Sequence, residues 1–219
     1  MRLFDFIHSL IDGVSLLLYS ERSTEKIVRE ASADQLFALS KSCSTTLEGV
    51  TVHYSLPYKH PLVKACVREA KFYNNEKAQT LLAQVAAEAL QALAEDMTAV
   101  SHQSIVIIPV PLSSVRQLKR GYNQVQKTIS LIHEPWVKQS DTPLLERTKD
   151  TPAQSSLSRN ERLLNMANAF STSGPLHNHT LYIVVDDVVT TGATLASADF
   201  ALRPHVPRES SVLLYAFSH

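Results

Sequence analysis

Two uninterrupted apolar runs mark the interior of this chain. Residues Ile105 to Ile108 and Leu181 to Val185 are continuously apolar, which is typical of strands that are covered on both faces. An alternating stretch at Val50–Tyr54 and an apolar stretch at 211–217 predict two further strands. Helical spacing of apolar residues is strongest at 74–96, which predicts a long amphipathic helix. The chain therefore contains both strands and helices.

The order of these elements indicates an α/β fold. Shorter helices are predicted at 62–71, 122–133, 158–167 and 192–202, so helices separate the strands along the chain. Uniformly apolar strands separated by helices predict a mostly parallel central sheet flanked by helices. Residues 1–48 have mostly helical spacing, and we expect them to form a helical N-terminal extension to a main domain at 49–219.

Composition narrows the class of protein. The chain has 219 residues, of which 44% are hydrophobic and 19% charged, as expected for a folded protein rather than a disordered one. Its formal net charge is zero, so a polyanion site has to be a local patch. Cys43 and Cys66 form no C-x-x-C pair, which argues against a zinc ribbon and favours reduced thiols. The polar residues that interrupt the apolar start argue against a signal peptide or a membrane span, so we expect a cytoplasmic protein.

Two aspartates follow the second buried run directly. Asp186 and Asp187 come at the carboxyl end of the predicted strand, where ligands of parallel sheets bind. The residues after them lead into a helix, whose free N–H groups and positive dipole end favour an anion. This connection offers hydroxyl groups and a tight turn at its glycine, and it consists of Thr190, Thr191, Gly192, Ala193 and Thr194. We expect it to cradle one phosphate group.

The acid pair suggests the rest of such a ligand. Two carboxylates repel a phosphate, but they accept hydrogen bonds from vicinal hydroxyl groups or meet Mg²⁺ held by a second anionic group. A sugar phosphate satisfies both requirements. The structural alternative is a turn in which an aspartate caps the next helix and the threonines are ordinary loop residues. The complete run of strand, two acids and T-T-G-x-T favours the ligand site.

A second candidate segment follows the first buried run. No acidic residue occurs between Met97 and His133, whereas Arg116, Lys119 and Arg120 are present. A basic loop directly after a buried strand suits a pyrophosphate group. Gly121 permits close approach of the backbone, and Asn123 either caps the next helix or contacts ligand. The alternative is a solvated basic face. His177 and His179 fit a solvated loop better than a metal site, so no metal ligands are predicted among the side chains.

These motifs resemble known families. The run IVVDDVVTTGAT resembles the phosphoribosyl-pyrophosphate motif of type I phosphoribosyltransferases. The resemblance implies that Asp186 and Asp187 hold the ribose hydroxyl groups, that the loop 190–194 holds the 5′-phosphate, and that Arg120 acts with the acids in catalysis.

The separated motifs of residues 50–219 are similar to those of the ComF family within this superfamily. The matching residues are Pro109–Val110–Pro111, Arg120–Gly121–Tyr122–Asn123–Gln124, Arg147, Thr151, Gln154, Leu157, Glu161–Arg162, Asn165 and Ala169–Phe170. The resemblance implies a hood over 143–165 and a set of pyrophosphate or hood residues. This set consists of Arg116, Lys119, Gly121, Asn123, Arg147, Gln154, Arg162 and Lys71. The four-cysteine zinc module that is common at the family's N-terminus is missing from residues 1–48.

The resemblance leaves two functions open. One is a phosphoribosyltransferase that binds phosphoribosyl pyrophosphate with Mg²⁺ and transfers the ribose to an acceptor that the sequence does not identify. The other is a non-catalytic module that binds a nucleotide or single-stranded DNA in a competence complex for DNA uptake, with a helicase as a partner. In a third, structural interpretation the helical N-terminus docks on another protein of such a complex.

Overall fold

The computed structural model describes residues 22–98, 104–138, 143–148 and 169–219. The elements in chain order are α2 (Ser23–Glu30), α3 (Ala33–Phe37), β1 (Cys43–Leu47), β2 (Val50–Leu56), α4 (Pro61–Tyr73), α5 (Glu76–Thr98), β3 (Ser104–Pro109), α6 (Ser114–Arg120), α7 (Gln124–Ile129), β4 (Val137–Lys138), β5 (Leu145–Arg147), β6 (Phe170–Thr172), β7 (Thr180–Val188), α9 (Ala193–Leu202), the 3₁₀ turn η1 (Arg203–His205) and β8 (Ser211–Ser218). The predicted strands and the long helix are all present among them.

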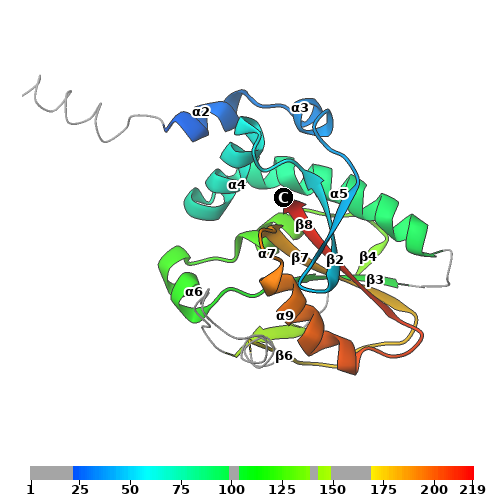
Figure 1. The fold of residues 1–219 in the computed structure, drawn as a ribbon. Coiled ribbons are helices and arrows are strands. Elements are labelled where there is room, and N and C mark those ends of the chain that lie inside the picture. The colour runs from blue at the N-terminus through cyan, green and yellow to red at the C-terminus, as the bar shows by residue number, and fades with distance from the viewer. Residues whose placement is uncertain (1–21, 99–103, 139–142, 149–168) are drawn as a thin grey trace, which may run out of the picture.

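Six of the strands form one sheet, in the order β1-β2-β8-β7-β3-β4 (Figure 1). All neighbouring pairs run parallel except β1 and β2, so the predicted mostly parallel α/β sheet is confirmed. β7 lies between β8 and β3, in the middle of the sheet. The carboxyl end of a central strand therefore carries the aspartate pair.

The N-terminal stretch differs in part from its prediction. α2 and α3 are helices, as expected, but residues 43–47 form strand β1 rather than continuing a helical extension. β1 pairs antiparallel with β2 through a turn at Glu48 and Gly49, both of which have positive φ. Two positive φ angles give the turn the twist of a tight hairpin, and glycine adopts such an angle without strain. The position of the predicted domain boundary near residue 48 stays a prediction.

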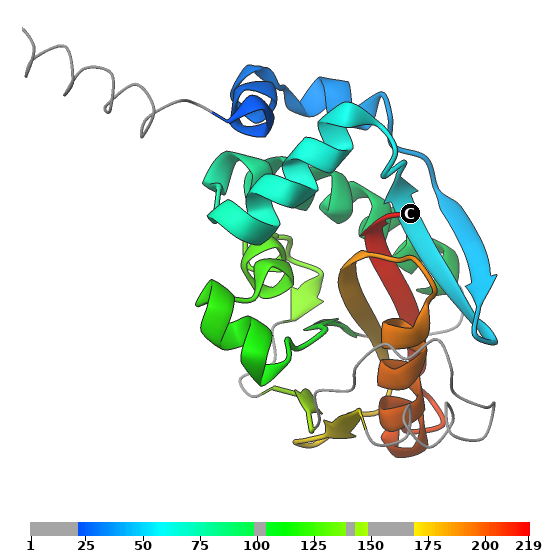
Figure 2. The ribbon, with the colours of Figure 1, turned by 60° about the vertical axis from the view of Figure 1, so that its left-hand side comes forward.

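Helices cover both faces of the sheet. α2, α3, α4, α5 and α7 lie on one side, whereas α9 and the β5–β6 pair lie on the other (Figures 1 and 2). Alternate side chains of β7 enter two separate cores, with Leu181, Ile183 and Val185 in the first and Tyr182 and Val184 in the second. Because successive side chains of a strand point to opposite faces, this two-sided burial explains why the run is apolar without alternation.

The basic segment after β3 is a helix and not the loop that the sequence predicted. Ser113 caps the first turn of α6 by accepting a hydrogen bond from the backbone N–H of Arg116, and Gly121 ends the helix with φ +76°. A serine cap and a C-terminal glycine in the left-handed conformation are common helix boundaries. α7 is also shorter than the predicted helix at 122–133. The helix predicted at 158–167 lies outside the described residues.

The N-terminal helices are fixed to α4 by a buried ion pair. Glu69 has no exposed surface, and its two carboxylate oxygens accept hydrogen bonds from the Arg22 guanidinium at 3.2 and 2.9 Å. Thr24 donates a further bond of 2.6 Å to Glu69. Burial acts to raise the pKa of Glu69, but these hydrogen bonds outweigh it and lower the pKa. The pair fixes the position of α2 against α4.

In the parts of the chain that the structure describes, we find no helix with the length and apolar character needed to cross a membrane.

Candidate functional site

The two aspartates lie in the last residues of β7. Strand alternation places Asp187 on the same face as Ile183 and Val185, which is the face covered by α4 and α7. Asp186 belongs to the opposite face, on the side of α9. The backbone N–H of Asp187 donates to Asp186 Oδ1 at 2.8 Å. Adjacent like charges are thus accommodated because they face different surroundings.

Asp187 is engaged within the protein. Its Oδ2 forms an ion pair with Lys71 Nζ and accepts a hydrogen bond from Gln124 Nε2, both at 2.7 Å, and its Oδ1 accepts a hydrogen bond from the backbone N–H of Val188 at 2.8 Å. Only 8% of its side chain is exposed, and among the described residues Lys71 is the cation that lies within ion-pair distance of it. A buried carboxylate needs this kind of pairing to stay ionised at low cost. Asp187 therefore holds β7, α4 and α7 together at this edge.

Asp186 is the more available acid. It is half-buried, and no described residue donates a hydrogen bond to its Oδ2. Burial, followed by the negative charge of Asp187, raises the pKa of Asp186 to about 7, although Lys71 and Arg116 partly oppose the shift. A carboxyl group with one open oxygen and a pKa near neutrality can accept a hydrogen bond from a hydroxyl group or join a cation site.

Arg120 lies at the same edge of the sheet as the acids. Its Nη1 donates to Gln124 Oε1 at 2.9 Å, and Gln124 in turn contacts Asp187. The guanidinium lies over the ring of Phe72 at 5.1 Å from the centroid. Burial lowers the pKa of Arg120, and the negative charge of Asp187 partly restores it. The structure thus brings together the two segments that the sequence separated by more than sixty residues.

The side chain of Gln124 completes this arrangement, and sequence reasoning assigned no role to it. It is only 4% exposed and is the first residue of α7. The sequence signal that could have identified Gln124 is its place in the R-G-Y-N-Q run, directly after a residue that is able to cap a helix. That capping residue is Asn123, whose Oδ1 accepts hydrogen bonds from the backbone N–H groups of Val125 and Gln126. Asn123 Nδ2 also donates to the carbonyl of Val110 at 2.9 Å, so the capping alternative explains Asn123.

The phosphate-loop candidate joins β7 to α9. Thr190, Thr191 and Ala193 are exposed, Thr194 is half-buried, and Gly192 is buried with φ +79°. A Cβ atom on Gly192 would lie 2.5 Å from Leu47 Cβ. The glycine is therefore required by contact with β1 as well as by its backbone angle.

The backbone N–H groups at the start of this helix are open. Val189 N–H is bonded to Ser218, and Ala193 N–H makes a long bond of 3.4 Å to Thr191 Oγ1. No described residue accepts a hydrogen bond from the N–H of Thr191, Gly192 or Thr194. Free N–H groups at the N-terminus of a ten-residue helix are suited to an anion.

Some of the remaining predicted residues lie within the described part of the chain and others lie outside it. Arg116 and Lys119 are exposed on α6, a helix with no buried residue, and Gly121 ends it. Arg147 lies on β5, where its guanidinium is 5.2 Å from the centroid of the Phe170 ring. Gln154 and Arg162 lie outside the described residues, as does most of the predicted hood at 143–165.

Tyr122, which comes shortly after Arg120 in the chain, is joined to the end of α4, which carries Lys71. Its hydroxyl group donates to the carbonyl of Ala70 at 3.0 Å and accepts from the backbone N–H of Asn74 at 2.8 Å. These bonds attach the α6–α7 junction to the end of α4. Tyr122 therefore has a structural role in positioning the two cations.

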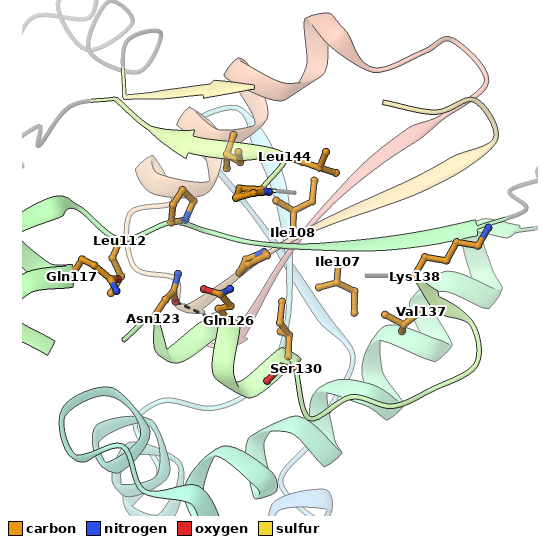
Figure 3. Close-up of a pocket in the computed structure, with 15 residues that line it drawn as sticks. Ile107, Ile108, Leu112, Gln117, Asn123, Gln126, Ser130, Val137, Lys138 and Leu144 are labelled. Atoms are coloured by element: carbon orange, nitrogen blue, oxygen red, sulfur yellow. Dashed lines mark hydrogen bonds between the residues drawn. The ribbon is translucent and has the colours of Figure 1, made fainter. Parts of the chain in front are cut away.

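A separate cavity of about 470 Å³ lies along the edge of β3 (Figure 3). In this view Gln126 of α7 and the capping residues Asn123 and Ser130 lie on one side of β3, and Leu144 lies on the other. Neither aspartate lines this cavity. Within the described residues, no group of three or more histidine, cysteine or acidic side chains is arranged to hold a metal ion alone.

The architecture is that of an α/β protein with an acid pair at the carboxyl end of a central parallel strand, and it is consistent with a phosphoribosyltransferase-like fold. No known family model matches the chain. Several known proteins match part of it, among them competence proteins and DNA utilization proteins. The chain is 38% identical over 103 residues to competence protein F of Haemophilus influenzae, a match that covers 44% of this chain and 43% of that protein.

Two other matches are similar in extent. The chain is 38% identical over 94 residues to DNA utilization protein YhgH of Escherichia coli O157:H7, covering 41% of this chain and 39% of that protein. It is 34% identical over 90 residues to competence protein ComFC of Bacillus subtilis, covering 41% and 35%. The similarity of the matched part to competence proteins F and ComFC and to a DNA utilization protein supports the resemblance to the ComF family. The matches span no more than 43% of the length of these relatives.

Proposed function

We propose that this protein binds phosphoribosyl pyrophosphate together with Mg²⁺, or a related nucleotide, where β7 meets α9. The observation that carries the proposal is the open Oδ2 of Asp186, which comes shortly before the open N–H groups of the 190–194 loop and next to Asp187, the partner of Lys71 and of the Gln124–Arg120 pair. A carboxylate beside an anion site is what a sugar phosphate requires, since its hydroxyl groups and its phosphate need opposite partners.

Each part of this ligand has a partner in the proposal. The 5′-phosphate accepts hydrogen bonds from the loop, and a ribose hydroxyl group donates to Asp186. The pyrophosphate lies toward Arg120, with Arg116 and Lys119 nearby on α6. Asp186 and the ligand oxygens suit Mg²⁺, which prefers hard oxygen ligands and neutralises a pyrophosphate leaving group when bound. Asp187 positions these groups through Lys71 and Gln124 rather than facing the sugar.

The chemistry we propose is transfer of the ribose to an acceptor. The bond between the ribose C1 and pyrophosphate breaks, and a nucleophile of the acceptor forms a new bond to C1. The protein contributes by orienting the sugar and by stabilising the charge of the departing pyrophosphate with Arg120. No described side chain is assigned as an acceptor-recognising group.

Isothermal titration tests the binding step. Phosphoribosyl pyrophosphate with Mg²⁺ is titrated into wild type, Asp186→Asn and the control Asp34→Asn, an identical chemical change at an exposed position on α3. We expect wild type and the control to bind equally and Asp186→Asn to bind at least about tenfold more weakly, the effect of one lost charge-assisted contact. Equal binding by all three proteins would remove Asp186 from the site, and no binding by wild type would refute the proposed function.

The relatives support a role in DNA uptake. Two of them are named competence proteins and one a DNA utilization protein. We propose that this chain serves the same process. A helicase of the uptake machinery stays a predicted partner, with no contact assigned to it.

A second candidate function is binding of single-stranded DNA without turnover. α6 favours it, because the helix has no buried residue and exposes Arg116 and Lys119 beside Leu118, which is 87% exposed. Fluorescence anisotropy with a labelled oligonucleotide tests it. Affinity should fall steeply between about 50 and 200 mM salt, and it should fall less steeply in Arg116→Gln/Lys119→Gln, because two phosphate contacts are lost. Affinity that does not depend on salt would exclude this function.

A further inference from the structure

Gln124 makes two directed contacts between opposite charges. Its Oε1 accepts a hydrogen bond from Arg120 at 2.9 Å and its Nε2 donates one to Asp187 at 2.7 Å. The side chain is nearly inaccessible, with 4% of its surface exposed. A single buried amide thus connects the cation after β3 with the acid at the end of β7.

The chemistry of the two neighbours fixes the orientation of the amide. A guanidinium only donates hydrogen bonds and a carboxylate only accepts them, so the oxygen has to face Arg120 and the nitrogen has to face Asp187. The reversed amide would place two donors together and two acceptors together. The backbone adds a further restraint, because Thr128 Oγ1 donates to the carbonyl of Gln124 at 2.8 Å and Asn123 caps the same turn.

We infer that Gln124 is a positioning residue that sets the distance between Asp187 and Arg120, and thereby selects ligands that carry a pyrophosphate. The inference rests on the proposed function. Arg120 is expected to meet the pyrophosphate, whereas Asp186, adjacent to Asp187, meets the sugar. A ligand that spans both groups depends on their separation, but ribose 5-phosphate, which lacks the pyrophosphate, does not depend on Arg120.

Other side chains cannot replace this amide. Glutamate would accept from Arg120 but would place a second carboxylate against Asp187. Methionine has a similar length but offers neither a strong donor nor a strong acceptor. Gln126 supplies a matched control, since it is a second glutamine on α7 but is exposed and two residues further along.

The experiment compares two probes, phosphoribosyl pyrophosphate with Mg²⁺ and ribose 5-phosphate, in wild type, Gln124→Met and Gln126→Met. We expect Gln124→Met to weaken binding of the pyrophosphate probe about tenfold, the effect of a misplaced charged donor, and to change ribose 5-phosphate binding less than threefold. Gln126→Met should leave both affinities unchanged. An equal loss for both probes would indicate general damage to the fold and would overturn the inference.

A ligand-free measurement accompanies this test. Gln124→Met and Arg120→Met should each lower the urea midpoint, and the double variant should lower it by less than the sum, because both changes remove the same hydrogen bond. Additive shifts would overturn the inference. If wild type binds neither probe, the proposed function and this inference both fail. If wild type binds both and Gln124→Met keeps the wild-type affinity ratio, this inference alone fails.

Discussion

The two adjacent aspartates should have opposite effects on stability when each is replaced by asparagine. Asp186→Asn removes a charge that the folded state disfavours, whereas Asp187→Asn removes a charge that Lys71 and Gln124 require. We therefore expect Asp186→Asn to raise the free energy of unfolding at pH 8 and Asp187→Asn to lower it. The two substitutions are chemically identical and occur at neighbouring positions, so each is the control for the other.

The magnitude for Asp186 follows from its pKa. Burial and the charge of Asp187 raise this pKa from its ordinary value of 3.8 to about 7, a shift of about three units at 1.36 kcal/mol each. Between these two pH values the folded protein binds a proton that the unfolded chain has released, so stability falls as the pH rises. At pH 8 the accumulated cost is at most about 4 kcal/mol, and solvent contact of the half-buried side chain reduces it.

Asparagine at position 186 has no such cost, because it does not ionise. Asp186→Asn should thus be more stable than wild type by at least about 1 kcal/mol at pH 8 and equal to it near pH 4. Asp187→Asn should lose about 2 kcal/mol, because it removes the carboxylate that pairs with Lys71.

Urea unfolding at pH 4, 6 and 8, with tests that the slope of the transition is constant, measures both effects. Destabilisation by Asp186→Asn at pH 8, or a difference from wild type that does not change with pH, would refute the reasoning about Asp186.

Two further predictions concern the scaffold of the site. Gly192→Ala should lower the free energy of unfolding by about 3 kcal/mol, because its new Cβ would lie 2.5 Å from Leu47 Cβ. Gly121 has a similar φ but open space around it, so the control Gly121→Ala should cost about 1 kcal/mol. Equal losses in chemical denaturation would mean that the contact with β1 does not restrict the loop. Arg22→Ala should cost about 3 kcal/mol at pH 7, because it leaves the carboxylate of Glu69 buried without its guanidinium. The pKa of Glu69 is lowered in the folded protein, so its contribution is present above 4.5 and is lost as the pH falls through the folded-state value; a loss that stays constant down to pH 3 would contradict this assignment.

The central sheet could be predicted because each strand is specified locally. The apolar runs at 105–108 and 181–185 are typical of strands covered on both faces, and both are strands in one parallel sheet. Strand β1 was missed because its sequence, CSTTL, contains one large apolar residue and relies on pairing with β2 for its structure. α6 was missed for a related reason. It has no buried face, so no hydrophobic period identifies it, and only its caps define it.

The candidate site shows where sequence patterns stop. Motif spacing pointed to the end of β7 and to Arg120, and the structure brings these two segments into contact through Gln124. Adjacent acids suggested a shared role, yet a strand turns neighbouring side chains to opposite faces, and the α4 face supplies Asp187 with an ammonium group. Lys71 and Gln124 act on this acid from positions 116 and 63 residues away in the chain, a contact that only the tertiary fold creates. In this chain Asp187 is held by Lys71 and Gln124, whereas Asp186 keeps one open oxygen, and for that reason we propose Asp186 as the acid that contacts ligand.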